Sequence, residues 1–158
     1  MRKPVLTFAA AALAAGVFAT SALAQSRDDG IVRVKSAFPP DETIARLKKD
    51  IASKGITFFS EIDQAQLAAQ AGVALPVRRS TLLVFGNPAL GTQFISGRPE
   101  AGIDWPVRLL VQQHADGTVW ASYTDFGWIA RRHGIAGDAP FRTATGVIAS
   151  ITASVQGQ

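Results

Sequence analysis

The fold of this chain is decided by residues 107–123, VRLLVQQHADGTVWASY. Apolar and polar side chains alternate on both sides of Asp116-Gly117, and this dipeptide favours the tight turn of a β-hairpin. We therefore predict two antiparallel strands, Val107–Gln113 and Thr118–Tyr123. A lone hairpin is only marginally stable in water, so its neighbouring strands must come from elsewhere in the chain.

Three earlier segments are predicted strands: Ile31–Ser36, Ile56–Ile62 and Thr81–Phe85. In the second, we expect Ile56, Phe58 and Ile62 to share a face. The third is apolar on both faces, which places it centrally in the sheet. Residues 73–80 contain Pro76 and the pair Arg78-Arg79, and we interpret them as a loop.

Helices are predicted after most of the strands. The first begins at Pro40 and ends at Gly55, and Asp63 with Gln66 resembles a capping box that opens a short second helix ending by Gly72. The others are Ala89–Ser96, Phe126–Arg132 and Asp138–Val155, with a break at Gly97–Gly102. The order β-α-β-α-β-α-β-β-α-α predicts an α+β fold, a single two-layer domain with helices packed on a mostly antiparallel sheet.

The first 24 residues have the pattern of a secretory signal peptide. A basic start and an apolar alanine-rich run precede the A-x-A site Ala22-Leu23-Ala24. We expect a flexible tail at residues 25–30, one domain at residues 31–158, and a periplasmic or secreted location. A leader that stays attached as a membrane anchor remains the alternative. No other apolar run approaches the roughly 18 residues of a membrane span, so we expect no membrane contact after cleavage.

Composition excludes several classes of chemistry. The chain has no cysteine, which excludes disulfides, thiol catalysis and thiolate metal sites. Two of its 16 basic residues lie in the leader, so the net charge of +4 falls to +2 without it. We therefore expect no nucleic-acid partner. His114 and His133 lie in different segments without metal-ligand spacing, and we expect neither metal nor cofactor.

Five segments, taken in order, carry a family resemblance. They are residues 42–47 (ETIARL), 85–92 (FGNPALGT), 103–108 (IDWPVR), 116–123 (DGTVWASY) and 132–134 (RHG). Together they resemble the domain of unknown function 302 family, from about Gly30 to Gly134 or beyond. The resemblance implies a compact, often dimeric α+β domain without an established activity or catalytic residues. The chain departs from the family at Pro39, where relatives tend to have a capping serine, and at Trp105, where leucine is usual.

Residues 86–92 form a glycine-containing loop between a strand and a predicted helix. Such a loop can bind an anion on backbone N–H groups, and Asn87 and Thr92 are its candidate ligands. It is not a P-loop, because Thr92 stands where the lysine should be. The commoner interpretation is a glycine turn in which Asn87 caps the helix.

Other candidates lie late in the chain. His133, beside Arg131-Arg132, ends a helix as a cap or acts as a general base or ligand contact. Arg108 shares a strand face with Leu110 and Gln112. If that face is covered, the arginine needs a carboxylate or a bound anion; if the face is open, the arginine is solvated.

Tyr123 and Asp125 complete the ligand-binding candidates. Asp125 could pair with Asp104 as acid and base, although solvated carboxylates are commoner. Ser122, Asp125 and His133 supply the residue types of a serine triad, but no G-x-S-x-G elbow surrounds Ser122 and we do not expect a hydrolase. Interface or core positions suit the three late tryptophans, Trp105, Trp120 and Trp128.

The sequence thus predicts an exported soluble domain that acts as a non-enzymatic binding or interaction module. We expect a homodimer and a small anionic ligand. The alternative is a small enzyme acting on an anionic substrate with His133 as acid and base. No residue is assigned a catalytic role.

Overall fold

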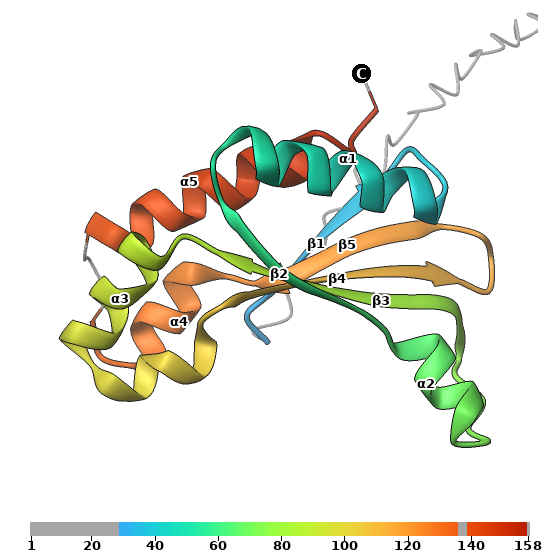
Figure 1. The fold of residues 1–158 in the computed structure, drawn as a ribbon, viewed down its shortest axis with the longest axis horizontal. Helices are drawn as coiled ribbons and strands as arrows, with labels where there is room; N and C mark the ends of the chain where they lie inside the picture. The colour runs from blue at the N-terminus through green and yellow to red at the C-terminus, as the bar shows by residue number, and fades with distance from the viewer. Residues whose placement is uncertain (1–28, 136–138, 158) are drawn as a thin grey trace, which may run out of the picture.

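The computed structural model describes residues 29–135 and 139–157 (Figure 1). The predicted leader, most of the predicted tail and the predicted start of the last helix, Asp138, lie outside these residues. The elements are β1 (Ile31–Ser36), α1 (Pro40–Ser53), β2 (Thr57–Asp63), α2 (Gln64–Gln70), β3 (Val77–Gly86), α3 (Pro88–Gly97), η1 (Pro99–Asp104), β4 (Val107–His114), β5 (Val119–Thr124), α4 (Phe126–Arg132) and α5 (Ala139–Ala153). The predicted order is confirmed, with the short 3-10 helix η1 added at the expected break.

The strands form one antiparallel sheet in the order β1-β5-β4-β3-β2. The predicted hairpin supplies β4 and β5, and β4 is the middle strand. β3 is an interior strand, as expected, but it is longer than predicted. Val77 already pairs with His114, so the loop expected over residues 73–80 was wrong for its last four residues. This end of β3 extends past most of the apolar core, where polar side chains do not prevent strand pairing.

A bulge in β2 corrects one expected face. The register slips between Phe58 and Ser60, so that Phe58 is opposite Phe85 while Ile62 is opposite Leu82. Because an extra residue reverses the alternation of side chains, Phe58 and Ile62 lie on opposite faces of the sheet. The shared face expected from the sequence was therefore wrong.

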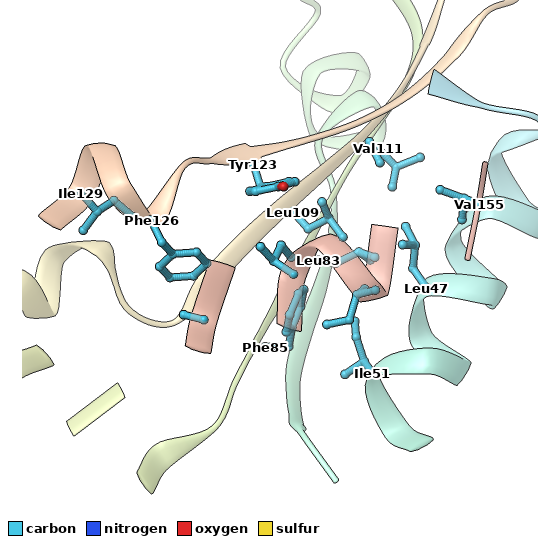
Figure 2. Packing of buried hydrophobic residues seen from close by; sticks show 14 of the residues in the cluster. Leu47, Ile51, Leu83, Phe85, Leu109, Val111, Tyr123, Phe126, Ile129 and Val155 are labelled. Carbon is cyan, nitrogen blue, oxygen red and sulfur yellow. The ribbon is translucent and has the colours of Figure 1, made fainter. Parts of the chain in front are cut away.

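Two helices cover one face of the sheet. α1 and α5 lie side by side above it in Figure 1, and Figure 2 shows Leu47, Ile51 and Val155 meeting the strand side chains. The fully buried side chains include Leu47, Ile51, Leu83, Phe85, Leu109, Val111, Ile148, Ile151 and Val155. Each helix buries one apolar stripe, which includes Ile44, Leu47 and Ile51 on α1 and Ala144, Ile148 and Ile151 on α5. Pro39 begins α1 without a side-chain cap, and its carbonyl accepts the N–H of Thr43.

The opposite face of the sheet remains partly open to solvent. On β4, Leu109 and Val111 are buried, whereas Leu110 between them is half-buried. We name this surface the bare face. Its apolar members include Ile31, Ile62, Leu82, Val84, Leu110 and Trp120, and its cations include Arg33, Lys35 and Arg108.

Candidate functional site

The side chains of two arginines and one histidine converge on the carboxylate of Asp104. His133 Nε2 lies 2.7 Å from Asp104 Oδ2, and Arg132 Nη1 lies 3.3 Å from both carboxylate oxygens. Arg108 Nη2 lies 3.5 Å from Oδ1. We call these four residues the Asp104 cluster. It brings together two of the candidates predicted from the sequence, Arg108 and His133, because both bind Asp104. We had considered Asp104 only as a partner of Asp125.

The four residues of the cluster come from three parts of the fold, because Arg132 and His133 both lie at the end of α4. Asp104 ends η1, Arg108 is the second residue of β4, and His133 takes the C-cap position of α4, where its N–H donates to the carbonyl of Ile129. The side chains of Asp104 and His133 are each 7% exposed. A buried carboxylate is costly without charged or hydrogen-bonding partners, so the cluster fixes η1 against β4 and the end of α4.

A histidine held by a carboxylate is the arrangement that orients a general base. The space beside this pair is small, however. The cavity that Asp104, Arg108 and Phe126 line has a volume of about 10 Å³. Such a volume holds about one water molecule. The described geometry therefore favours a clamp between elements over a site for a substrate.

The sequence left open whether Arg108 is solvated or paired with a carboxylate, and in the structure it is both. It lies on the bare face, and half of its side chain is exposed. Its Nη2 also donates to the carbonyl of Ile103 at 3.1 Å. The arginine is therefore solvated and paired with a carboxylate at the same time, without needing a bound anion.

The glycine loop has a packing role in the structure. Ideal Cβ atoms on Gly86 and Gly91 would lie 2.8 Å and 2.1 Å from Trp105 Nε1. These two positions must lack side chains because the indole of Trp105 lies against their backbone. The two glycines whose spacing suggested an anion-binding loop thus make room for Trp105, the residue at which the chain departs from the family pattern.

The polar groups of this loop are used within α3. Asn87 Oδ1 accepts the N–H groups of Ala89 and Leu90 at 3.0 and 3.3 Å. Thr92 Oγ1 donates to the carbonyl of Pro88 at 2.8 Å. The geometry is that of a capped helix start, and it keeps Asn87 and Thr92 apart from the Asp104 cluster.

Tyr123 and Asp125 have structural partners as well. Tyr123 lies in the core facing the helices, where burial raises the pKa of its hydroxyl; the charge of Asp125 adds to this shift and the Thr152 hydroxyl opposes it. Asp125 Oδ1 accepts the N–H of Trp128 at 2.7 Å and caps α4. Ser122 lies on the bare-face side of β5, so the side chains of a triad are not assembled.

The three tryptophans occupy separate places. Trp105 lies against the glycine loop, Trp120 lies on the bare face, and an ideal Cβ on Gly30 would meet the ring of Trp128 at 2.5 Å.

The last residues of the predicted tail are also in contact with the domain, because the N–H of Asp125 donates to the carbonyl of Gly30 at 2.7 Å.

Over residues 29–135 and 139–157, no three histidine, aspartate or glutamate side chains come together in a way that could hold a metal ion. None of the helices in this part of the chain has the length and apolar character needed to cross a membrane.

The open antiparallel sheet with helices on one face defines a small α+β domain. A sequence model described as "Domain of unknown function DUF302" matches residues 32–153. The chain therefore belongs to the DUF302 family. The crystal structure of an uncharacterized conserved DUF302 protein from Bacillus stearothermophilus has the same fold, with a TM-score of 0.72 and 15% identity over 81% of this chain and 99% of that chain.

Three Brucella proteins are similar in sequence. Fluoride-specific ion channel FluC 1 of Brucella suis is 34% identical over 131 residues, which cover 80% of this chain and 51% of the relative. Fluoride-specific ion channel FluC 1 of Brucella abortus and FluC 2 of Brucella melitensis match at the same identity, with 48% of each covered. The chain thus spans about half the length of these curated relatives.

Proposed function

We propose that this protein is an exported, non-enzymatic interaction module that self-associates through its bare face. The observation that carries this proposal is the half-buried apolar row across the middle of an uncovered sheet. Leu82 and Leu110 lie opposite each other on β3 and β4, with Trp120 on the next strand. Partly exposed apolar side chains that lie near one another on a surface are common at protein contact sites.

Helix α2 supports the same proposal. None of its seven residues is buried, and Leu67 on it is 54% exposed. In the loop that follows, Val73 is 56% exposed and Leu75 is 37% exposed. Isolated helices of this length are unstable in water, and most helical stability in proteins comes from packing an apolar face. A partner that covers α2 supplies this packing.

The area of the bare face indicates how much of α2 takes part. Five strands about 4.8 Å apart, with about six residues each, give a face of about 500 Å². A standard interface buries about 800 Å² on each partner. Because Ser80 Oγ donates to Gln64 Oε1, α2 is attached on the bare-face side, and in Figure 1 it lies on the side of the sheet away from α5. The face and α2 together approach the required area.

A second copy of the chain is the partner that fits best. Two sheets can pack face to face at about 10 Å when their inner side chains are apolar. The cations Arg33 and Arg108 are each about half exposed, and they can remain in water at the margin of such a contact. The same surface then serves both partners, as a two-fold dimer requires.

The test is the mass of the exported protein in solution by sedimentation equilibrium. We expect a dimer for the parent and a monomer for Leu110→Lys, which places a charge in the middle of the face. Ala149→Lys, on the exposed side of α5, is the matched control and should remain dimeric. A parent that stays monomeric at high concentration would overturn the proposal. N-terminal sequencing that begins at Gln25 tests export.

A second candidate function follows from the Brucella relatives. They are named as fluoride channels, and this chain aligns with only half of each. We propose that the protein assists the transport or tolerance of fluoride as a separate domain. A strain lacking the gene should grow less well in fluoride than its parent, and complementation should restore growth; equal growth of both strains argues against this role.

The alternative of an enzyme with His133 as acid and base has less support. The pair of His133 and Asp104 is buried, and the adjoining cavity is far smaller than a typical substrate pocket. A substrate screen in which His133→Ala loses a measurable turnover would favour the enzyme instead.

A further inference from the structure

A groove runs along the helix side of the molecule, between the end of α1, the start of α3 and the outer side of α5. Its volume is about 620 Å³, and its walls include Lys54, Asn87, Gln93, Arg142, Gly146 and Ser150. Ligand pockets in proteins typically have volumes of about 300 to 1,000 Å³. The groove is thus large enough for a small molecule, and it lies away from the bare face.

Behind the groove lies a smaller apolar cavity. Its volume is about 40 Å³, and its walls include Phe85, Trp105 and Ile148. Ile56, Asn87, Leu90 and Val147 line both spaces, so the cavity adjoins the floor of the groove. An apolar space that the core leaves unfilled favours a small apolar group, because dry cavities lose van der Waals contacts.

The outer walls of the groove favour negative charge. Lys54 and Arg142 line it, and no aspartate or glutamate is among the described residues that do so. Arg142 already interacts with another group of the protein, but its guanidinium has five N–H donors and can bind a further acceptor. Lys54 Nζ binds Asp50 at 2.7 Å and its side chain is 29% exposed. An ammonium group has three N–H donors, so this lysine can bind a second acceptor in the groove.

We propose that the groove binds a small amphipathic anion, a short-chain carboxylate whose apolar end enters the floor while its carboxylate lies between Lys54 and Arg142. The site is separate from the bare face, so it does not depend on self-association. It gives a ligand class to the anion binding that the sequence predicts, and it places that ligand away from the Asp104 cluster.

Gly146 offers a way to close the groove without damaging the fold. An ideal Cβ on this residue meets no atom within 4 Å, although the residue lies inside α5. Glycine inside a helix is destabilising by roughly 0.5–1 kcal/mol relative to alanine. Gly146→Leu should therefore fill the groove while the thermal stability of the protein stays the same or rises.

The experiment is a titration of the full exported protein with hexanoate, followed by amide NMR. We expect saturable shifts in α3 and α5, with 1-hexanol binding at least about tenfold more weakly, a difference of about 1.4 kcal/mol. Gly146→Leu should lose binding, and Lys54→Gln should weaken hexanoate but not hexanol. Ala149→Leu and Lys49→Gln are matched controls outside the groove, and both should bind as the parent does.

Three results would overturn this inference: no saturable shift with hexanoate, equal binding of hexanol, or unchanged binding by Gly146→Leu. The mass of each variant, measured in the same samples, separates this result from the proposed self-association. A protein that is dimeric but does not bind hexanoate supports the interaction module and rejects the groove as a ligand site.

Discussion

Both faces of the sheet carry apolar side chains, but the bare face also carries cations, and the two faces have different surroundings. Leu109 and Leu110 are neighbours on β4; the first is fully buried under α1 and α5, and the second is half-buried on the bare face. An antiparallel sheet commonly packs one face on the core and leaves the other face in solvent. Helices α1 and α5 cover one side, and the self-association proposed above would cover the other.

The largest expected change in stability comes from replacing one of these two leucines at a time. Leu109→Ala should lower the free energy of unfolding by about 2–5 kcal/mol, because it leaves a cavity in a close-packed core. Leu110→Ala should cost less than about 1 kcal/mol in dilute protein, where the bare face is wet. Urea denaturation measures both. If self-association covers the bare face, the cost of Leu110→Ala should grow with protein concentration. Equal costs in dilute protein would contradict the difference between the faces.

A second test addresses the point where the two faces meet. The Asp104 cluster links Arg108 of the bare face to His133 of the helix side. Asp104→Asn keeps the shape but leaves two arginines and the imidazole of His133 without the carboxylate, and we expect a loss of about 2–3 kcal/mol in the free energy of unfolding.

Glu100→Gln is the control for this change. Glu100 is 69% exposed and 4.0 Å from Arg98, so its removal should have almost no effect on stability. Thermal unfolding of both variants at the same pH gives the comparison. An Asp104→Asn protein as stable as the control would show that the cluster does not hold the elements together.

A third test concerns the tryptophan on the helix side. Gly91→Ala should destabilise the protein by about 1–3 kcal/mol because its Cβ overlaps the indole of Trp105. Adding Trp105→Leu should remove much of this penalty in a double-mutant cycle. Gly97→Ala, where a Cβ meets no atom within 4 Å, is the control. Strictly additive effects at positions 91 and 105 would rule out the proposed fit.

The smallest expected effect is a change in the pH dependence of stability, caused by Tyr123 on β5. Tyr123 is buried on the helix side, and its pKa is raised above the usual value of 10.0. Its neutral form is therefore favoured in the folded state, so this stabilisation is complete at low pH and is lost as the pH rises past the pKa of the folded state. Unfolding curves above pH 10 should show steeper loss for the parent than for Tyr123→Phe. Parallel curves would mean that the pKa of Tyr123 is the same in the folded and unfolded states.

Most of the fold could be predicted because its signals are local. The Asp116-Gly117 turn, the Asp63 cap and the stripe of α1 each depend on residues a few positions apart. The bulge at Phe59 was missed because alternation alone does not reveal an inserted residue. The start of β3 was missed because Arg78-Arg79 is polar, whereas strand pairing there needs only backbone groups.

The site was predicted in part. His133 and Arg108 were named from their own environments, but the role of Asp104 depends on bringing η1, β4 and α4 together. No local pattern links residues 29 positions apart, as in the pair of Asp104 and His133. The Asn87 cap was predicted, but the packing of Trp105 on Gly86 and Gly91 was not, because the side chain that these glycines accommodate comes from residue 105.

The fit of Trp105 against two glycines also limits the order in which this surface can evolve. An ancestor with alanine at position 86 or 91 has no room for the indole, so both glycines must be present before the tryptophan arrives. After that step neither glycine can change alone. Positions 86, 91 and 105 are then constrained together until the tryptophan is replaced.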